Sequence, residues 1–500
     1  MPKNRKIEQT TGSYISETQS TSIMKSCAKL LLAATAVSFA TICESKPAFK
    51  PQSSLASIHK DKNESLHTFT SHKPTLQSIQ QIQRGGADSG KSSLSTAMFN
   101  LVKGIVGVGV LSLPAGVSAF GDAQSAALPA IALITIMGSF SGYSFSLIGR
   151  ICAYTGASSY SDAWEKSVGE KSAWIPALVC SSMTFSAVLA YSMVLAETFQ
   201  GIANTMGINS SRSQTLTALT AIVLYPLCSM KNLASLAPFS ILGIIGMALT
   251  VVVMAIRFFD GSYALPTGKF LESVGHMPEF GSKGASAALS PNAIILVCML
   301  STAFMAHFNA PKFFNELENN TIARFNTLVG VSFGAAIVFF AAAAALGFAT
   351  FGKASQGFIL SNYSSKDGLI GISRIAVAFS LIFTYPLVFV GCRDGFLSLM
   401  KVPKEKQTDS YLNKLTIGLL TIVTIAAFNL KDLSFLMAFG GATLGNGLIY
   451  VFPALMFNSV VKNMGDSAPA ALKNETYFAT FTMVLGLTVG VIGATMALKS

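Results

Sequence analysis

A lysine, an asparagine and several glycines lie within one apolar stretch, residues 96–121. Asn100, Lys103 and Gly107 follow one another at spacings of three and four, so a helix would place all three on one face. Charged side chains are costly inside a bilayer, and those that occur there usually mark a substrate or ion pathway. Gly107 and Gly109 can interrupt the helix and leave backbone groups without helical partners. The stretch therefore predicts a broken helix that holds a charged solute in the membrane.

Structural interpretations of the same residues stay open. Glycines also allow ordinary membrane helices to pack closely, and a lysine paired with a carbonyl or an acid would serve stability alone. If the helix begins near Thr96 at the membrane surface, Gly107 lies roughly 16 Å deep, close to the middle of the hydrocarbon layer. Lys103 would then be about 10 Å deep and would have to extend a long way to reach water.

A second apolar run is interrupted in a similar way, at residues 301–317. His307, Asn309 and Pro311 lie inside it, and proline removes a helical hydrogen bond. His307 can titrate near neutral pH, although a buried, hydrogen-bonded histidine is the commoner case. This run is the sixth apolar segment of the chain and residues 96–119 are the first. Such a pair is what an inverted repeat of five plus five helices would give.

The composition is that of a membrane protein. Of the 500 residues, 51% are hydrophobic and 12% are charged, whereas soluble domains carry about 25% charged residues. The net charge of +12 is spread over the N-terminal tail and short loops, so no nucleic-acid partner is expected. Lys and Arg are more frequent on the side of residues 150–173 and 393–414, which predicts that the first helix starts in the cytoplasm. The expected segments are residues 96–119, 125–149, 173–200, 213–230, 235–258, 291–314, 326–350, 368–392, 413–429, 433–458 and 477–498.

Residues 1–92 are a polar tail in front of the expected membrane domain, residues 93–500. Within the tail, residues 24–48 combine a positive flank, a short apolar run and a small-residue exit, as a signal peptide does. With the basic, hydroxyl-rich stretch that follows, the tail resembles bipartite plastid-targeting sequences. A plastid envelope is then one predicted location. The alternative is a plain disordered cytosolic tail on a protein of the vacuole, another endomembrane or the plasma membrane.

Several motifs in order resemble the amino acid/auxin permease family. The first helix of that family carries GxGxLxLP, as residues 107–114 do here. The resemblance covers residues 93–500 and implies an all-α integral membrane protein with about eleven transmembrane helices. It further implies a LeuT-like inverted five-plus-five repeat, with helices one and six broken, that moves amino acids by alternating access. The other motifs are YTGASSYSDAWEKSVG at 154–169, YPLCSMKNLASLAPFSILG at 225–243, AFMAHFNAPKFFNEL at 303–317, ILSNY at 359–363 and FTYPLVFVGCRD at 383–394.

This resemblance gives the two interrupted segments separate tasks. The carboxylate of an amino acid needs N–H donors, which a break in the first helix offers at the start of its second half. The ammonium needs acceptors, which unwound carbonyls in the sixth helix supply. Few acidic residues lie near the midplane, so neutral amino acids are favoured as substrates. The expected substrate-binding residues are Gly107, Val108, Gly109, Val110, Tyr191, Ser301, Phe304 and Phe439, of which each aromatic is also a candidate for ordinary packing.

Proton and sodium coupling are both open. Sodium-coupled relatives carry an asparagine in helix one and a threonine before the proline of helix eight, as Asn100 and Thr384 do here. The proton-coupled branch has a lysine–glycine pair at the position of Lys103, but a histidine where Asn100 stands. A lysine beside the site would repel sodium and act as a built-in cation. The expected ion-coupling residues are Asn100, Lys103, His307, Ser380 and Thr384.

Other classes of function have less support in the sequence. No GxSxG, HExxH or pair of intramembrane aspartates indicates a membrane-embedded enzyme, and the seven cysteines lack the spacing of a metal site. A channel, or a carrier of auxin or another small organic anion, remains as an alternative. Apart from H⁺ or Na⁺ no cofactor is expected, and the expected partners are an amino acid and the lipid bilayer, with the protein a monomer.

Overall fold

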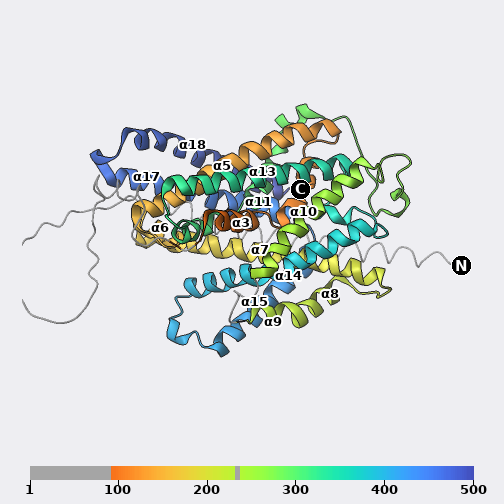
Figure 1. Ribbon diagram of the computed structural model, residues 1–500, viewed down its shortest axis with the longest axis horizontal. Helices are drawn as coiled ribbons and strands as arrows, with labels where there is room; N and C mark the ends of the chain where they lie inside the picture. The colour runs from red at the N-terminus through yellow and green to blue at the C-terminus, as the bar shows by residue number, and fades with distance from the viewer. Residues whose placement is uncertain (1–89, 91, 231–236, 500) are drawn as a thin grey trace, which may run out of the picture.

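The structure is a computed structural model that describes residues 90, 92–230 and 237–499. The tail predicted for residues 1–92, with its signal-like stretch at 24–48, lies outside the described residues except for 90 and 92, and it stays a prediction. The described helices run side by side along one direction (Figure 1). The loop 259–290 lies at one end of the bundle, and the short helix α6 (Tyr160–Ser167) lies at the other. The described residues form helices and two isolated bridges, which confirms the all-α class.

The number of membrane segments agrees with the sequence. Eight described helices are long and apolar enough to cross a membrane, and nine are when the bent pair Leu94–Ile105 and Val108–Ser118 counts as one span. Two further segments are shorter in the described chain, namely an apolar helix at Gly243–Phe259 and the succession of α8 (Arg212–Leu219), a π-helical turn and α9 (Tyr225–Cys228). The long spans include α5 (Ala127–Thr155), α7 (Trp174–Thr205), α13 (Ile322–Phe351), α14 (Gly368–Leu399), α15 (Asp409–Asn429) and α18 (Ala470–Ala497), and the shorter apolar helix is part of α10 (Ala237–Phe259).

The first and the sixth segments are interrupted, as the sequence predicts. A proline stands at the start of the second half of each, where its missing N–H needs no helical partner. Each second half therefore begins as a new helix behind a short irregular stretch. The pieces are α3 (Leu94–Ile105), a 3-10 turn (Val108–Ser112) and α4 (Leu113–Ser118) in the first segment, and α11 (Ala293–Ala303), a 3-10 turn (His307–Asn309) and α12 (Ala310–Glu316) in the sixth.

The tenth segment packs closely against the sixth. Between α16 (Leu433–Gly440) and α17 (Phe452–Met464) the glycine-rich chain forms two π-helical stretches. A Cβ on Gly441 would collide with the carbonyl of Cys298 in α11, so only glycine allows this approach. Around these segments, α5 packs along α13, and α14 packs along both α7 and α10. The long helices thus form a frame that fixes the broken ones in the middle of the bundle.

A buried ion pair joins α10 to α14 at the end of the bundle that carries the loop 259–290. Arg257 donates from Nε and Nη2 to the two carboxylate oxygens of Asp367, at 2.7 and 2.6 Å. Asp367 is fully buried, accepts a hydrogen bond from the Tyr263 hydroxyl at 3.0 Å, and caps the N-terminus of α14. Burial would raise the pKa of Asp260 nearby, but hydrogen bonds from Ser262 and Arg257 outweigh it and lower that pKa.

We expect Asp367→Ala to lower the free energy of unfolding by about 3 kcal/mol, because it leaves Arg257 with only the part-exposed Asp260 as a counter-charge and uncaps a helix. Thermal or denaturant unfolding in detergent measures the loss. Glu279→Ala is the matched control, since the Glu279–Lys353 pair is 61% and 60% exposed and should contribute about 0–1 kcal/mol. The double variant Arg257→Ala/Asp367→Ala should regain part of the loss. Equal, small effects of the Asp367 and Glu279 variants would contradict this account.

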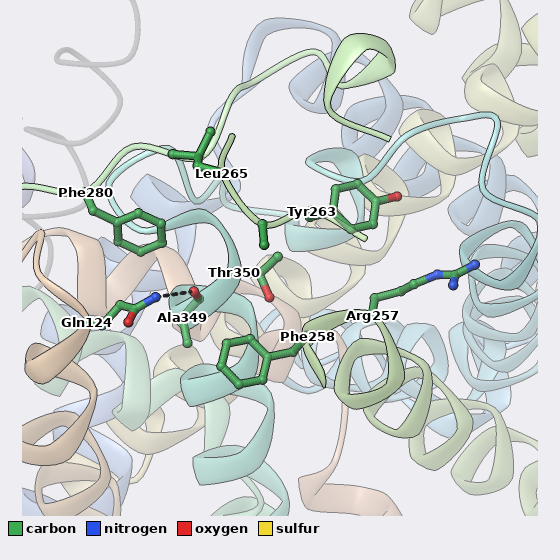
Figure 2. Close-up of a pocket in the computed structure, with 9 residues that line it drawn as sticks. Gln124, Arg257, Phe258, Tyr263, Leu265, Phe280, Ala349 and Thr350 are labelled. Atoms are coloured by element: carbon green, nitrogen blue, oxygen red, sulfur yellow. Dashed lines mark hydrogen bonds between the residues drawn. The ribbon is translucent and has the colours of Figure 1, made fainter. Parts of the chain in front are cut away.

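A cavity of about 300 Å³ lies beside this ion pair, between the loop 259–290 and the end of α13 (Figure 2). Phe258, Phe280 and Leu265 surround it, while the guanidinium of Arg257 points away from it (Figure 2). Gln124 closes one side by donating from Nε2 to the carbonyl of Ala349 at 3.4 Å. Apolar side chains thus form much of the wall of this cavity, and no residue of the two helix breaks lines it.

Candidate functional site

A cavity of about 110 Å³ lies where the two interrupted helices meet. It is surrounded by five of the membrane segments, and the side chains on its wall are apolar or uncharged. The residues that line it are Gly104, Ile105, Gly107, Val108, Gly109, Met183, Thr184, Ser186, Ala187, Ala190, Tyr191, Thr302, Ala303, Met305, Phe308, Val388, Leu436, Met437 and Gly440.

The break in the first helix presents backbone donors to this cavity. After Ile105 the chain leaves the helix, and Gly107 is extended, with φ −111° and ψ −162°. A new turn begins at Val108, and its first hydrogen bond runs from the Val110 N–H to the Gly107 carbonyl at 3.4 Å. The N–H groups of Val108 and Gly109 precede that bond, as the first donors of any helix do. They are therefore available to an anionic group, which the start of a helix favours.

The break in the sixth helix presents backbone acceptors at the same place. α11 ends at Ala303, after which Phe304 and Ala306 leave the helical conformation, with φ/ψ of −81°/8° and −139°/0°. The carbonyls of Leu300 and Thr302 accept the N–H groups of Phe304 and Met305, at 2.9 and 3.3 Å. Those of Ser301 and Ala303 have no backbone partner among the described residues, as is usual for the last turn of a helix. A Cβ on Gly109 would lie only 3.2 Å from the Cα of Ala303, so the two breaks are in contact. Donors for a carboxylate and acceptors for an ammonium thus face one small cavity.

The side chains of the cavity add hydroxyl groups and no charge. The Tyr191 hydroxyl lies 3.3 Å from the position that a Cβ on Gly107 would take. Thr302 and Thr184 also line the cavity, but their hydroxyls donate to backbone carbonyls, that of Thr302 to Met437 at 2.7 Å. No Asp, Glu, Lys, Arg or His is among the residues that line the cavity. A solute with a charged side chain would therefore be left without a counter-charge, which is costly in a buried site.

Of the eight residues expected to bind substrate, Gly107, Val108, Gly109 and Tyr191 line the cavity. The other four, Val110, Ser301, Phe304 and Phe439, are not among the residues that line it, and their direct contact with substrate stays a prediction. All four are buried in the bundle. Val110 is fully buried, Ser301 donates to Asn446 Oδ1 at 2.8 Å, the Phe304 ring packs on Phe340 with centroids 4.6 Å apart, and Phe439 stacks on Phe435 at 5.6 Å.

Among the residues expected to couple an ion, two lie on α3. Asn100 is exposed and Lys103 is half-buried, and neither lines the cavity. Lys103 lies on the side of α3 opposite Leu101 and Ile105, which are buried in the bundle, whereas Gly107 lies beyond the end of α3 and so does not share a helix face with it. In the part of the chain that the structure describes, no hydrogen bond or ion pair is found for the Lys103 ammonium. An effect of the Lys103 charge on an ion bound next to the cavity stays a prediction.

The other three expected ion-coupling residues lie on the eighth and sixth segments. Thr384 donates to the Ser380 carbonyl at 2.8 Å, and both lie on α14 one and two turns before Val388, which lines the cavity. His307 is fully buried, with Nε2 2.9 Å from the carbonyl of Ser141. Its ring packs between Phe145 and Phe333. No charged group faces it among the described residues, so a proton held on this ring would lack a counter-charge.

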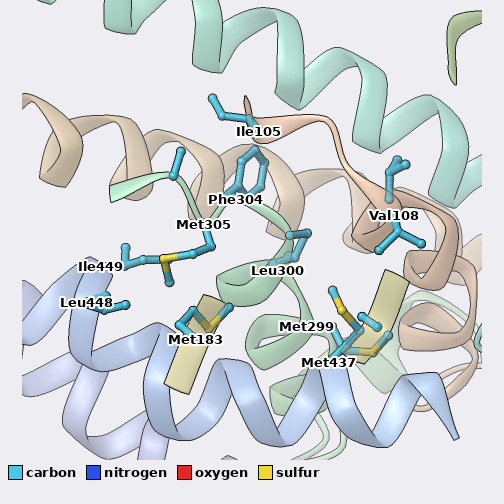
Figure 3. Packing of buried hydrophobic residues seen from close by; sticks show 14 of the residues in the cluster. Ile105, Val108, Met183, Met299, Leu300, Phe304, Met305, Met437, Leu448 and Ile449 are labelled. Atoms are coloured by element: carbon cyan, nitrogen blue, oxygen red, sulfur yellow. The ribbon is translucent and has the colours of Figure 1, made fainter. Parts of the chain in front are cut away.

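The sequence did not single out several residues of the wall, above all Met183, Met305 and Met437 (Figure 3). Each lies in a different segment, and a methionine in an apolar run carries no signal that separates a cavity wall from a core. Thr302 was missed by one position, because Ser301 beside it has the same chemistry. One residue corresponds to 100° around a helix, which is enough to move a side chain from the wall to the core.

Membrane-spanning helices, two of them broken around a small cavity with backbone donors and acceptors, define a membrane transporter of small solutes. The family described as "Transmembrane amino acid transporter protein" matches residues 90–496, and the chain belongs to this family. "Amino acid transporter AVT6E" of Arabidopsis thaliana is 24% identical over 430 residues, 82% of this chain and 84% of that protein. "Vacuolar amino acid transporter 2" of Saccharomyces cerevisiae is 22% identical over 403 residues, 76% and 79% of the two chains. The crystal structure of MhsT in complex with L-phenylalanine aligns with a TM-score of 0.48 at 13% identity, over 83% of this chain and 100% of that one.

Membership of this family confirms the resemblance found in the sequence. The chain is a multi-pass membrane protein of a transporter family, and the alternative of a membrane-embedded enzyme is excluded. The compartment, the oligomeric state and the coupling ion stay predictions.

Proposed function

We propose that this protein is a secondary active transporter that carries neutral amino acids by alternating access, driven by a proton or sodium gradient. The observation that carries the proposal is the contact between the two helix breaks. It places the unpaired N–H groups of Val108 and Gly109 and the carbonyl end of α11 on one uncharged cavity. An amino acid zwitterion carries the two complementary groups on one carbon, so a single small solute can satisfy both breaks at once.

In the proposed complex the carboxylate accepts hydrogen bonds from the Val108 and Gly109 N–H groups and from the Tyr191 hydroxyl. The ammonium donates to carbonyls at the end of α11, near Thr302 and Ala303. The side chain of the amino acid then occupies the apolar part of the cavity. Auxin or another small organic anion would satisfy the donors but leave the acceptors unpaired, which disfavours it. Both relatives named above are amino acid transporters, which supports the same choice.

Uptake into proteoliposomes tests this proposal. A panel of radiolabelled neutral, acidic and basic amino acids and auxin is offered, with an inward sodium gradient and an inward pH gradient imposed separately. We expect saturable uptake of neutral amino acids that one gradient stimulates, and counterflow with unlabelled substrate. Non-saturable flux without counterflow would indicate a channel, and uptake of auxin alone would replace the proposed substrate class.

The sodium alternative makes a separate prediction for Thr384, whose hydroxyl lies one turn from the cavity wall. If sodium is the coupling ion, Thr384→Ala should raise the sodium concentration for half-maximal uptake by about tenfold, because a good cation site loses one oxygen ligand. Substrate affinity at saturating sodium should change much less. Thr421→Ala is the matched control, because Thr421 also donates to its own helix and lies on α15, away from the cavity. Wild-type uptake that ignores sodium would show that Thr384 has a packing role.

A further inference from the structure

Three methionines from different segments border the cavity, Met183 on α7, Met305 after α11 and Met437 on α16 (Figure 3). Methionine is unbranched and flexible, so it fills irregular space and can move when the contents of a cavity change. No charged residue lies beside them on the wall, so shape and size remain as the means by which this wall can select a side chain.

Met437 lies against Gly109, which is part of the proposed carboxylate site. Its Cε lies 2.7 Å from the point that a Cβ on Gly109 would occupy, and the Met437 side chain is almost fully buried. On the other side of Gly109, the Cα of Ala303 lies 3.2 Å from the same point. The break in the first helix is therefore confined between the Met437 thioether and the end of α11. This is a narrow part of the cavity.

The backbone of Met437 is tied to the sixth segment, and its unbranched side chain packs into the cavity wall. Thr302, in the last turn of α11, donates its hydroxyl to the Met437 carbonyl at 2.7 Å and so ties α16 to the sixth segment. Gly440, one turn further on the same face of α16, leaves open space, since a Cβ there would meet only the Thr302 hydroxyl at 3.9 Å. Shortening Met437 would thus join its own volume to the space beside Gly440.

We propose that Met437 sets the upper size limit of the substrate side chain, so that this protein carries small aliphatic amino acids such as alanine in preference to leucine and phenylalanine. The proposal rests on the proposed function and names its substrate class. A larger side chain has to displace the thioether from Gly109, against the contacts that hold it in a buried position. A small side chain fits beside it.

The test is the ratio of leucine to alanine uptake in proteoliposomes, measured for purified protein at concentrations far below half-saturation. Met437→Ala should raise this ratio about tenfold or more, as expected when an apolar pocket gains room for one or more methylenes. Phenylalanine should gain at least as much. Met254→Ala is the matched control, because Met254 is a fully buried methionine of α10 that does not line the cavity. It should leave the ratio unchanged.

Met437→Phe is the second variant and should lower the ratio, so a poorly folded alanine variant does not leave the question without an answer. An unchanged ratio in both variants, or an equal change in Met254→Ala, would overturn the role of Met437. A wild-type protein that prefers leucine or phenylalanine to alanine would also overturn it. Wild-type protein that takes up no amino acid above empty liposomes would instead contradict the proposed function, so the two failures are distinguishable.

Discussion

Gly107→Leu should abolish amino acid uptake, by more than about 100-fold, while the protein remains folded in the membrane. A leucine side chain at this position would start 3.3 Å from the Tyr191 hydroxyl and would extend into a cavity of about 110 Å³. It would cover the N–H groups of Val108 and Gly109 that are proposed to hold the carboxylate. Loss of two donors to a charged group is worth about 3 kcal/mol or more, which corresponds to the expected factor.

The backbone of Gly107 makes this prediction more specific than the sequence alone did. From the sequence, glycine was expected to permit the helix break itself. In the structure, φ is −111° and ψ is −162°, an extended conformation that any residue adopts. The break can therefore survive the substitution, and uptake should be lost because the leucine side chain fills the cavity. Glycine is needed here for room and not for conformation.

Two comparisons make the result interpretable. Gly107→Ala adds a single methyl group, and the Tyr191 hydroxyl can move by a few tenths of an ångström, so uptake should fall only a few-fold. Gly330→Leu is the matched control, because Gly330 is exposed on α13 and a Cβ there would meet nothing within 4 Å. It should transport normally. Near-normal uptake by Gly107→Leu, with equal amounts of protein in the membrane, would show that the break in the first helix does not bind the substrate.

The fold and the position of the site were predictable because they depend on strong local signals. Long apolar runs have few alternatives in a membrane, where every backbone group must be paired internally. Glycine and proline within two of these runs marked the breaks, since few other residues interrupt a helix so reliably. The break in the first helix consists of Gly107, Val108 and Gly109, so the glycines that predict the break also identify these residues as part of the site.

The rest of the wall was not predictable from one sequence. Phe304 and Met305 are adjacent and both apolar, yet the first ring packs against Phe340 while the second side chain lines the cavity. Which of two neighbours faces a cavity depends on the rotation of the helix, and a membrane helix that is apolar on every side gives no amphipathic pattern from which to read it. Only tertiary packing determines that rotation. The same argument applies to Phe439 and Met437.

Lys103→Asn should convert the response of uptake from a pH gradient to a sodium gradient. Lys103 is half-buried, lies in the last turn of α3 next to Gly104 of the cavity wall, and has no ion-pair partner among the described residues. A sodium ion bound ~6 Å from its ammonium, at an effective dielectric constant near 20, would be repelled by about 2–3 kcal/mol. That repulsion weakens a site ~50-fold or more. With the lysine in place, we expect proton-linked transport and little effect of sodium.

Asparagine removes the charge of Lys103 without removing a polar side chain. The measurement is initial uptake of alanine at fixed membrane potential, as a function of external pH at constant sodium and of sodium at constant pH. In Lys103→Asn the stimulation by an inward pH gradient should weaken, and stimulation by sodium should appear. Lys312→Asn is the control, because Lys312 is 68% exposed on α12 and far from the proposed ion.

The alternative is that Lys103 only stabilises α3. In that case Lys103→Asn would lower the amount of folded protein but leave the pH dependence of the remaining uptake unchanged. The coupling proton would then bind elsewhere, and His307 would be the next residue to replace. Among the described residues no carboxylate neighbours His307, whose ring packs against Phe145 and Phe333. A proton site there would require water to enter the break in the sixth helix during transport. Loss of pH dependence in His307→Gln but not in Lys103→Asn would therefore move the proton pathway from the first helix to the sixth.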